Sequence, residues 1–87
     1  MGKKNYKILY EINFINPIYK TKKFIEFKTS TYNNRYLQVR QYKKMVKFYE
    51  IDMDNDREIS INKDTVKWLI DKKRFSKENR KKLKKIL

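Results

Sequence analysis

One stretch of this chain alternates with a period of two residues, and it reads Arg35-Tyr36-Leu37-Gln38-Val39-Arg40-Gln41-Tyr42. Successive side chains of a strand point to opposite faces of a sheet, so this period predicts a β-strand. Leu37 and Val39 are expected to face a core. The opposite face would carry aromatic rings, an amide and a guanidinium, from Tyr36, Gln38, Arg40 and Tyr42. Bases stack on rings and cations attract phosphates, so this face is a plausible platform for unpaired nucleic acid.

The flanking sequence predicts strands around this stretch and helices after it. Alternating or β-rich runs predict strands over 7–15, 21–29, 45–52 and 59–61, with polar turns over 31–34 and 54–56. In the first strand one face is expected to hold the apolar side chains, which are Ile8, Tyr10, Ile12 and Phe14. Asn62 is a predicted N-cap for a helix with Val66, Leu69 and Ile70 on its apolar face.

These elements predict an α+β fold, an antiparallel sheet of four to five strands followed by a C-terminal helix. Residues 1–75 would form one domain. Ser76 resembles a second helix cap, and residues 76–87 would form a basic helix or tail. The tail could be a solvated terminus, a sequence-independent binder of phosphates, or a membrane-surface helix, although Leu83, Ile86 and Leu87 supply only a thin apolar side.

Positive charge dominates the composition, with 24 Lys and Arg against 10 Asp and Glu and a net charge of +14. The charge is uneven: residues 29–49 hold five basic side chains and no acid, whereas residues 50–64 hold six acids and two basic side chains. Uniform lysine-rich codon usage would not produce this contrast. A polyanionic partner is therefore expected.

The chain lacks the residues that several kinds of protein chemistry require. The chain has no Cys, no His and a single glycine, Gly2, which leaves no disulfide, few transition-metal ligands and no glycine-rich phosphate loop. The acidic run from Asp52 opens like a calcium loop, but Arg57 and Lys63 occupy its sixth and twelfth positions, where glycine and glutamate are required. We therefore expect a hairpin turn there, and a protein that is not an enzyme and has no metal or cofactor.

No apolar run approaches the roughly 20 residues of a membrane span, and the first residues lack the apolar segment of a signal peptide. The expected location is intracellular, in the cytoplasm or nucleoid, without membrane association.

Residues 34–71 resemble the single-stranded-DNA-binding domain of the transcriptional coactivator family called positive cofactor four. The likeness runs through the alternating stretch, a strand, an acidic turn, the sequence Ile59-Ser60-Ile61-Asn62 and a helix containing Leu69. Residues 24–39 are also similar to the opening of Pur-alpha repeats. Both families have curved four-stranded sheets followed by a helix, pair as dimers between chains or repeats, and bind single strands on the sheet. Lys44 and Glu58, or their neighbours, stand where the first family has glycines.

The resemblance implies particular contacts for this chain. Nucleic acid would meet Arg35, Tyr36, Gln38 and Arg40, together with Lys28 and Lys47 on adjacent strands. Tyr42, from the same face, and Lys44, from the acid-free segment, complete the expected site. The resemblance also implies a homodimer joined through the helix, at Val66, Leu69 and Ile70.

Three functions are compatible with the sequence. The first is single-stranded DNA or RNA binding in replication, repair or transcription. The second is a phage- or mobile-element-encoded interaction module that uses its basic surface against an acidic or nucleic-acid-binding protein. The third is binding to structured RNA or ribosomes. The sequence does not distinguish DNA from RNA, because recognition of the 2′-hydroxyl leaves no short motif.

Overall fold

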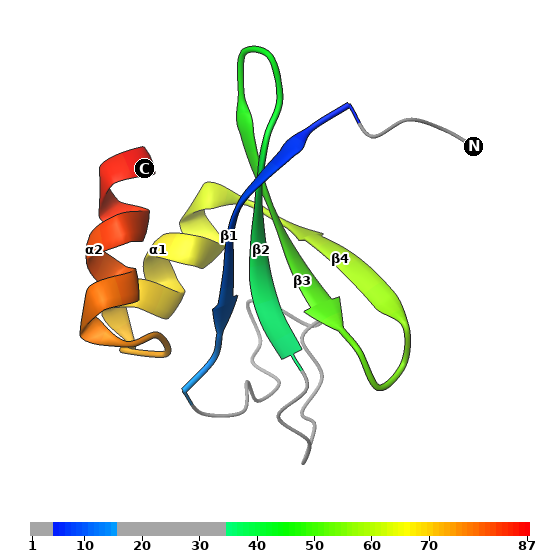
Figure 1. Ribbon diagram of the computed structural model, residues 1–87. Coiled ribbons are helices and arrows are strands. Elements are labelled where there is room, and N and C mark those ends of the chain that lie inside the picture. Colours follow the sequence, from blue (N-terminus) through cyan, green and yellow to red (C-terminus); the bar gives the residue numbers. More distant parts are fainter. Residues whose placement is uncertain (1–4, 16–34) are drawn as a thin grey trace.

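A computed structural model describes residues 5–15 and 35–87 of the chain. Its elements follow the order β1 (Lys7–Asn13), β2 (Arg35–Gln41), β3 (Val46–Asp52), β4 (Arg57–Ile61), α1 (Lys63–Asp71) and α2 (Lys77–Ile86). The strands form one antiparallel sheet in the order β1-β2-β3-β4 (Figure 1). The predicted α+β class, a sheet followed by helical structure, is confirmed. The predicted strand over 21–29 and turn over 31–34 lie outside the described residues.

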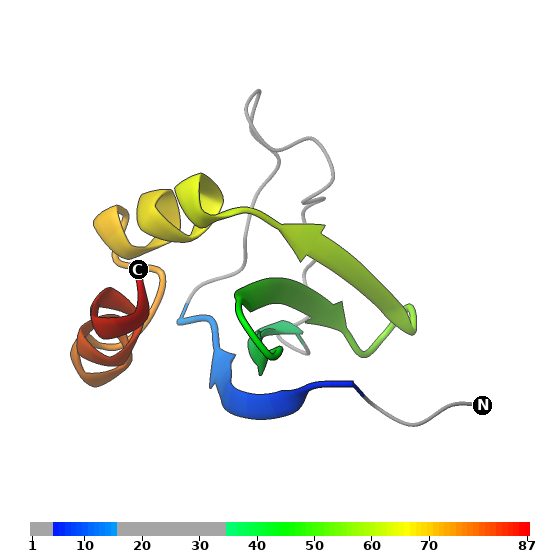
Figure 2. The same cartoon turned by 90° about the horizontal axis from the view of Figure 1, so that it is seen from above.

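The two helices lie together on one side of the curved sheet (Figure 2). The core between the helices and the sheet is apolar. Leu37 and Val39, which the two-residue alternation predicted to face the core, are both fully buried. The buried cluster comprises Ile12, Leu37, Val39, Phe48, Ile61, Val66, Leu69, Ile70, Phe75 and Leu83. The helices cover one face of the sheet, and no described helix lies over the other, which we call the open face.

A bulge changes the face of one predicted core residue in β1. Ile8 pairs with Arg40 and Tyr10 pairs with Val39, with a register shift between Ile8 and Tyr10. Directly paired residues share a face, so Ile8 lies on the open face. The expectation that Ile8 shares a face with Tyr10 and Ile12 is therefore wrong, because one extra residue shifts the alternation.

Local side-chain caps explain where both helices begin. Asn62 Oδ1 accepts a hydrogen bond from the Thr65 backbone N–H at 2.8 Å, and Ser76 Oγ accepts one from the Asn79 N–H at 3.2 Å. Each cap satisfies a backbone donor that has no partner within the helix. Both predicted caps are confirmed. Neither helix in the described part of the chain is long and apolar enough to cross a membrane.

The apolar side of each helix packs inward. Val66, Leu69 and Ile70 of α1 belong to the buried cluster, so they are not exposed for contact with a second copy of the chain. Leu83 of α2 is also fully buried in this cluster, which places the basic C-terminal segment against the rest of the fold.

Candidate nucleic-acid interface

Two tyrosine rings lie against the Arg40 guanidinium on the open face, and a third tyrosine ring packs beside one of them. The central carbon of the guanidinium lies 3.8 Å from the centroid of the Tyr49 ring and 4.5 Å from that of Tyr6. The Tyr6 and Tyr42 centroids are 5.4 Å apart, and Lys47 Nζ lies 5.2 Å from the Tyr42 centroid. All three rings are half-buried. We call Tyr6, Tyr42 and Tyr49 the tyrosine surface.

Arg40 is itself almost enclosed, with 5% of its surface exposed. Its Nε donates to Gln38 Oε1 at 2.6 Å, and its Nη2 pairs with Glu58 at 2.9 Å. Gln38, 7% exposed, donates from its amide to Glu11 at 3.0 Å. Arg40 and Gln38 were predicted as direct contacts, but their polar groups are engaged within the fold. Arg40 instead positions the rings, since cation–π attraction holds Tyr6 and Tyr49 against it.

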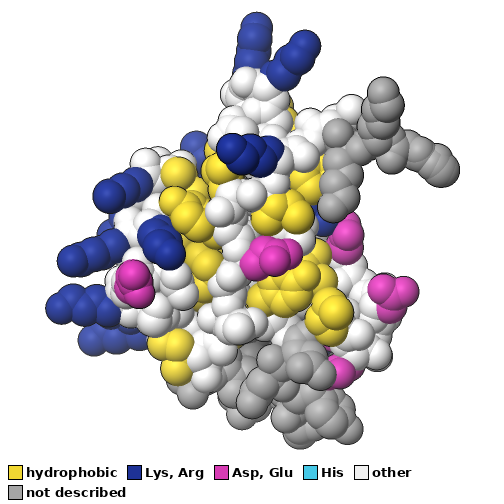
Figure 3. Space-filling model, viewed as in Figure 1, with side chains coloured by type: hydrophobic (Ala, Val, Ile, Leu, Met, Phe, Trp, Pro, Cys, Tyr) yellow, Lys and Arg dark blue, Asp and Glu magenta, His cyan; other side chains and the backbone are white. Residues whose placement is uncertain are grey.

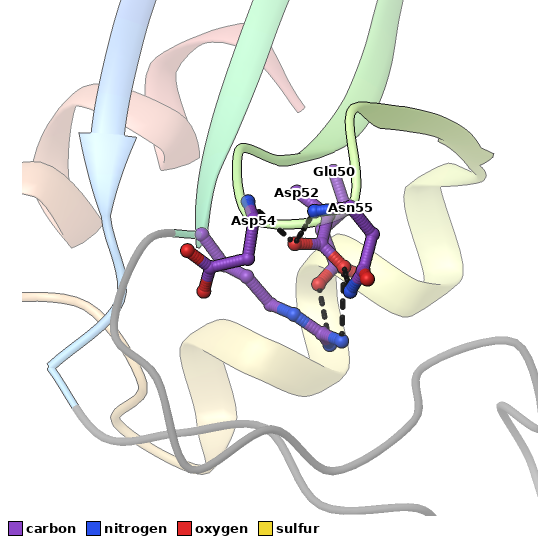
Figure 4. Close-up of polar contacts among 5 residues, drawn as sticks. Glu50, Asp52, Asp54 and Asn55 are labelled. Atoms are coloured by element: carbon purple, nitrogen blue, oxygen red, sulfur yellow. Dashed lines mark hydrogen bonds and ion pairs between the residues drawn. The ribbon is translucent and has the colours of Figure 1, made fainter.

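Arg35 lies on the helix-covered face together with Leu37, because the two residues are two positions apart in the strand. It is 6% exposed and pairs with Glu50 at 2.9 Å and Asp52 at 3.3 Å (Figure 4). Asp52 also accepts hydrogen bonds from the backbone N–H groups of Asp54 and Asn55, which closes the predicted turn after β3. The predicted role of Arg35 in nucleic-acid contact therefore has no support in the structure, because two carboxylates engage its guanidinium.

The acids of this cluster have shifted pKa values in opposite directions. Burial raises the pKa of the Glu50 carboxyl to about 7, and the attraction of Arg35 offsets only part of this effect. Burial also acts to raise the pKa of Asp52, but hydrogen bonds from Asn55 and Asp54 and the charge of Arg35 together hold it below its usual value. Glu50 Oε1 and Arg35 Nε are buried and have no hydrogen-bond partner among the residues that the structure describes.

Two tyrosines on the open face also have perturbed pKa values. Hydrogen bonding with Tyr42, followed by burial, raises the pKa of Tyr49, while burial and the nearby Glu11 carboxylate raise that of Tyr36. Both phenols therefore remain neutral at physiological pH. Their rings keep the neutral aromatic character on which base stacking depends.

Basic side chains gather beside the tyrosine surface, at the β2–β3 hairpin formed by Tyr42–Met45. The backbone N–H of Tyr42 donates to the Met45 carbonyl at 2.8 Å, which places Lys43 and Lys44 at the exposed tip. A shallow hollow of about 560 Å³ lies here, lined by Asn5, Tyr42, Lys43, Lys44, Met45 and Lys47. Cations and an aromatic ring thus share one concave surface.

The predicted site residues therefore separate into groups. Tyr42, Lys44 and Lys47 meet at the hairpin, and Tyr36 lies on the same face toward the other end of β2. Arg35, Gln38 and Arg40 are buried, and Lys28 lies outside the described residues. Sequence reasoning missed Tyr6, Tyr49, Lys43 and Met45. Tyr49 follows Lys47 by two residues, so the alternation of the strand could have indicated that both lie on one face. Only the fold brings Tyr6 to the same place.

The open face is electrostatically divided. Figure 3 shows basic side chains over the hairpin at the top, with acidic side chains in the middle and at the right. Glu11 and Glu58 belong to this face through their contacts with Gln38 and Arg40. Phosphates would be attracted to its hairpin end and repelled from its acidic part.

Comparisons of the chain with protein-family models, with curated protein sequences and with solved structures found no match. Function is therefore inferred from the geometry of the described residues.

Proposed function

We propose that this protein binds single-stranded nucleic acid, without catalysis, at the hairpin end of the open face. One observation carries the proposal: a buried arginine holds two tyrosine rings, a third ring packs against one of them, and Lys43, Lys44 and Lys47 lie beside this third ring. Among the described residues, none of these lysines forms an ion pair with a carboxylate. The site therefore combines positioned π-surfaces with cations that are available to phosphate.

Each part of the site contributes a different interaction. Bases would stack on the exposed portions of the rings, at about 1–3 kcal/mol per stacked base. Lysines would neutralise phosphates and release counterions, which makes binding weaker at high salt. Glu11 and Glu58 would keep the backbone near the hairpin. Stacking tolerates every base, so little sequence preference is expected, and unpaired strands are favoured because their bases are free to stack.

The proposal is tested by titrating the protein into fluorescent oligothymidylate and, for comparison, into a fluorescent duplex of mixed sequence, each at two salt concentrations. We expect tighter binding to the single strand and weaker binding at the higher salt concentration. The double variant Tyr42→Leu/Tyr49→Leu should raise the Kd at least about 30-fold, because two stacking rings are lost.

Tyr10→Leu is the matched control, since this half-buried tyrosine pairs with Val39 on the helix-covered face. It should leave the Kd within about two-fold. The proposal fails if the single strand binds no better than the duplex, or if the double variant and the control bind alike. A protein partner retained after nuclease treatment, with no oligonucleotide binding, would instead support an interaction module.

A further inference from the structure

A second basic surface lies on the other side of the molecule, between the two helices. A hollow of about 500 Å³ there is lined by four cations, Lys67, Lys73, Arg80 and Lys84, over an apolar floor of Ile70 and Leu87. Among the described residues that line it, Asp71 is the one acid. We call this hollow the helix groove.

The cations of the helix groove are available to a ligand. Within the described residues, the ion pairs involve only Arg35 and Arg40, so none of the groove cations is ion-paired, and Asp71 leaves the four cations in excess. Arg80 Nη1 donates to the Phe75 carbonyl at 2.9 Å, which holds the guanidinium while leaving its charge uncompensated. Four cations against one carboxylate in the same hollow indicate a polyanionic ligand.

A third hollow connects the hairpin with the helices. It measures about 520 Å³ and is lined by hairpin residues, by Lys63 at the start of α1 and by Ile86 at the end of α2. It shares Lys43, Lys44 and Met45 with the hollow beside Tyr42. Ile86 is followed directly by Leu87 of the helix groove. Basic side chains thus line each of the three hollows, beside the tyrosine surface, at the hairpin and between the helices. Figure 3 shows the groups of basic side chains over the hairpin at the top and over the helices at the left.

We propose that a bound single strand continues along a path through these hollows, so that its phosphate backbone leaves the tyrosine surface, crosses the β2–β3 hairpin and enters the helix groove. The inference rests on the proposed function and extends it to the length of strand that one molecule covers. A lipid surface fits less well, because the central apolar residue of α2, Leu83, is fully buried in the core and has no side free for acyl chains.

The test compares a short oligothymidylate of about 6 nucleotides with one of about 20, which lie toward the lower end and beyond the upper end of the site sizes of about 4–16 nucleotides of single-strand binders. The variant Lys67→Gln/Lys84→Gln removes two groove charges. Its matched control is Lys72→Gln/Lys85→Gln, which removes two exposed lysines outside the lining of the groove and lowers the net charge equally.

For single strands the logarithm of affinity falls with the logarithm of salt by about 0.7 per phosphate contact. At about 0.1 M salt each lost contact then weakens binding about five-fold, and two contacts weaken it up to about 25-fold. We expect this loss for the long oligonucleotide with the groove variant, and a salt slope reduced by about 1.4. For the short oligonucleotide the groove variant should match its control.

Equal effects of the groove variant and its control on the long oligonucleotide would overturn the path, as would a groove effect seen only with duplex DNA or only with anionic vesicles. The short oligonucleotide separates this inference from the proposed function. If the wild type binds the short oligonucleotide and Tyr42→Leu/Tyr49→Leu binds it more weakly, the proposed tyrosine site is supported, whatever the result for the groove variant. If the tyrosine variant binds it normally, the proposed function itself fails.

Discussion

Replacing Glu50 by glutamine should remove a pH dependence of stability that the buried cluster with Arg35 and Asp52 creates. The Glu50 carboxyl is fully buried, and its pKa rises from 4.5 to about 7 in the fold. In the unfolded chain this group ionises near its ordinary pKa, so between these values the folded state binds the proton more tightly. Stability therefore falls as pH rises through this window and levels off above it.

The size of the effect follows from the shift. One pKa unit corresponds to about 1.4 kcal/mol, so the rise from 4.5 to about 7 amounts to about 3 kcal/mol lost between acid and neutral pH. Asp52 acts in the opposite sense, because its pKa is lowered. Its contribution is lost only as the pH falls below its ordinary value of 3.8, which lies outside this window.

Urea unfolding at about pH 5 and about pH 7.5, followed by Trp68 fluorescence, measures the effect. The wild type should lose about 2 kcal/mol more than Glu50→Gln over this interval, which covers most of the window, because glutamine does not ionise. Glu78→Gln, an exposed acid of α2, is the control and should keep the wild-type dependence. If Glu50→Gln and the wild type change equally with pH, the buried carboxyl does not titrate as argued.

Three further substitutions test the fold and the site. Leu83→Ala should lower the free energy of unfolding by about 2–5 kcal/mol, because it leaves a cavity in the core; a loss below about 1 kcal/mol would mean that α2 is not packed as described. Asn62→Ala should cost about 0.5–2 kcal/mol in the same urea assay through loss of the α1 cap, and Asn62→Asp should restore most of it. Arg40→Lys should weaken binding of the short oligonucleotide about five-fold or more, because lysine lacks the fork that joins Gln38 to Glu58 and holds the rings; wild-type affinity together with wild-type stability would argue against this positioning role.

Local features of the chain were predictable because their causes are local. The alternation around Leu37 and Val39 indicated a strand and its buried side, and Asn62 and Ser76 indicated where helices begin, since a cap bonds a backbone group three residues away. The polyanionic partner that the charge imbalance indicated stays a prediction. The bulge near Ile8 was not predictable, because the register against β2 creates it and the sequence of β1 alone does not.

The composition of the candidate site depended on contacts between strands. The alternating stretch places Arg40 on the open face, but Glu58 of β4, Gln38 and the rings of Tyr6 and Tyr49 determine that it is enclosed. In the same way, Glu50 and Asp52 of β3 engage Arg35.

The sequence by itself therefore determined that residues 35–41 form a strand, which side chains lie on each of its two faces, and the excess of positive charge. Only the tertiary structure decided which cations remain available to a ligand, because the pairing of strands brings carboxylates to some of them and leaves the lysines of the hairpin and the helix groove without such partners among the described residues. The physical reason is that an ion pair requires two side chains within a few ångströms, and residues distant in sequence reach that separation only through the fold.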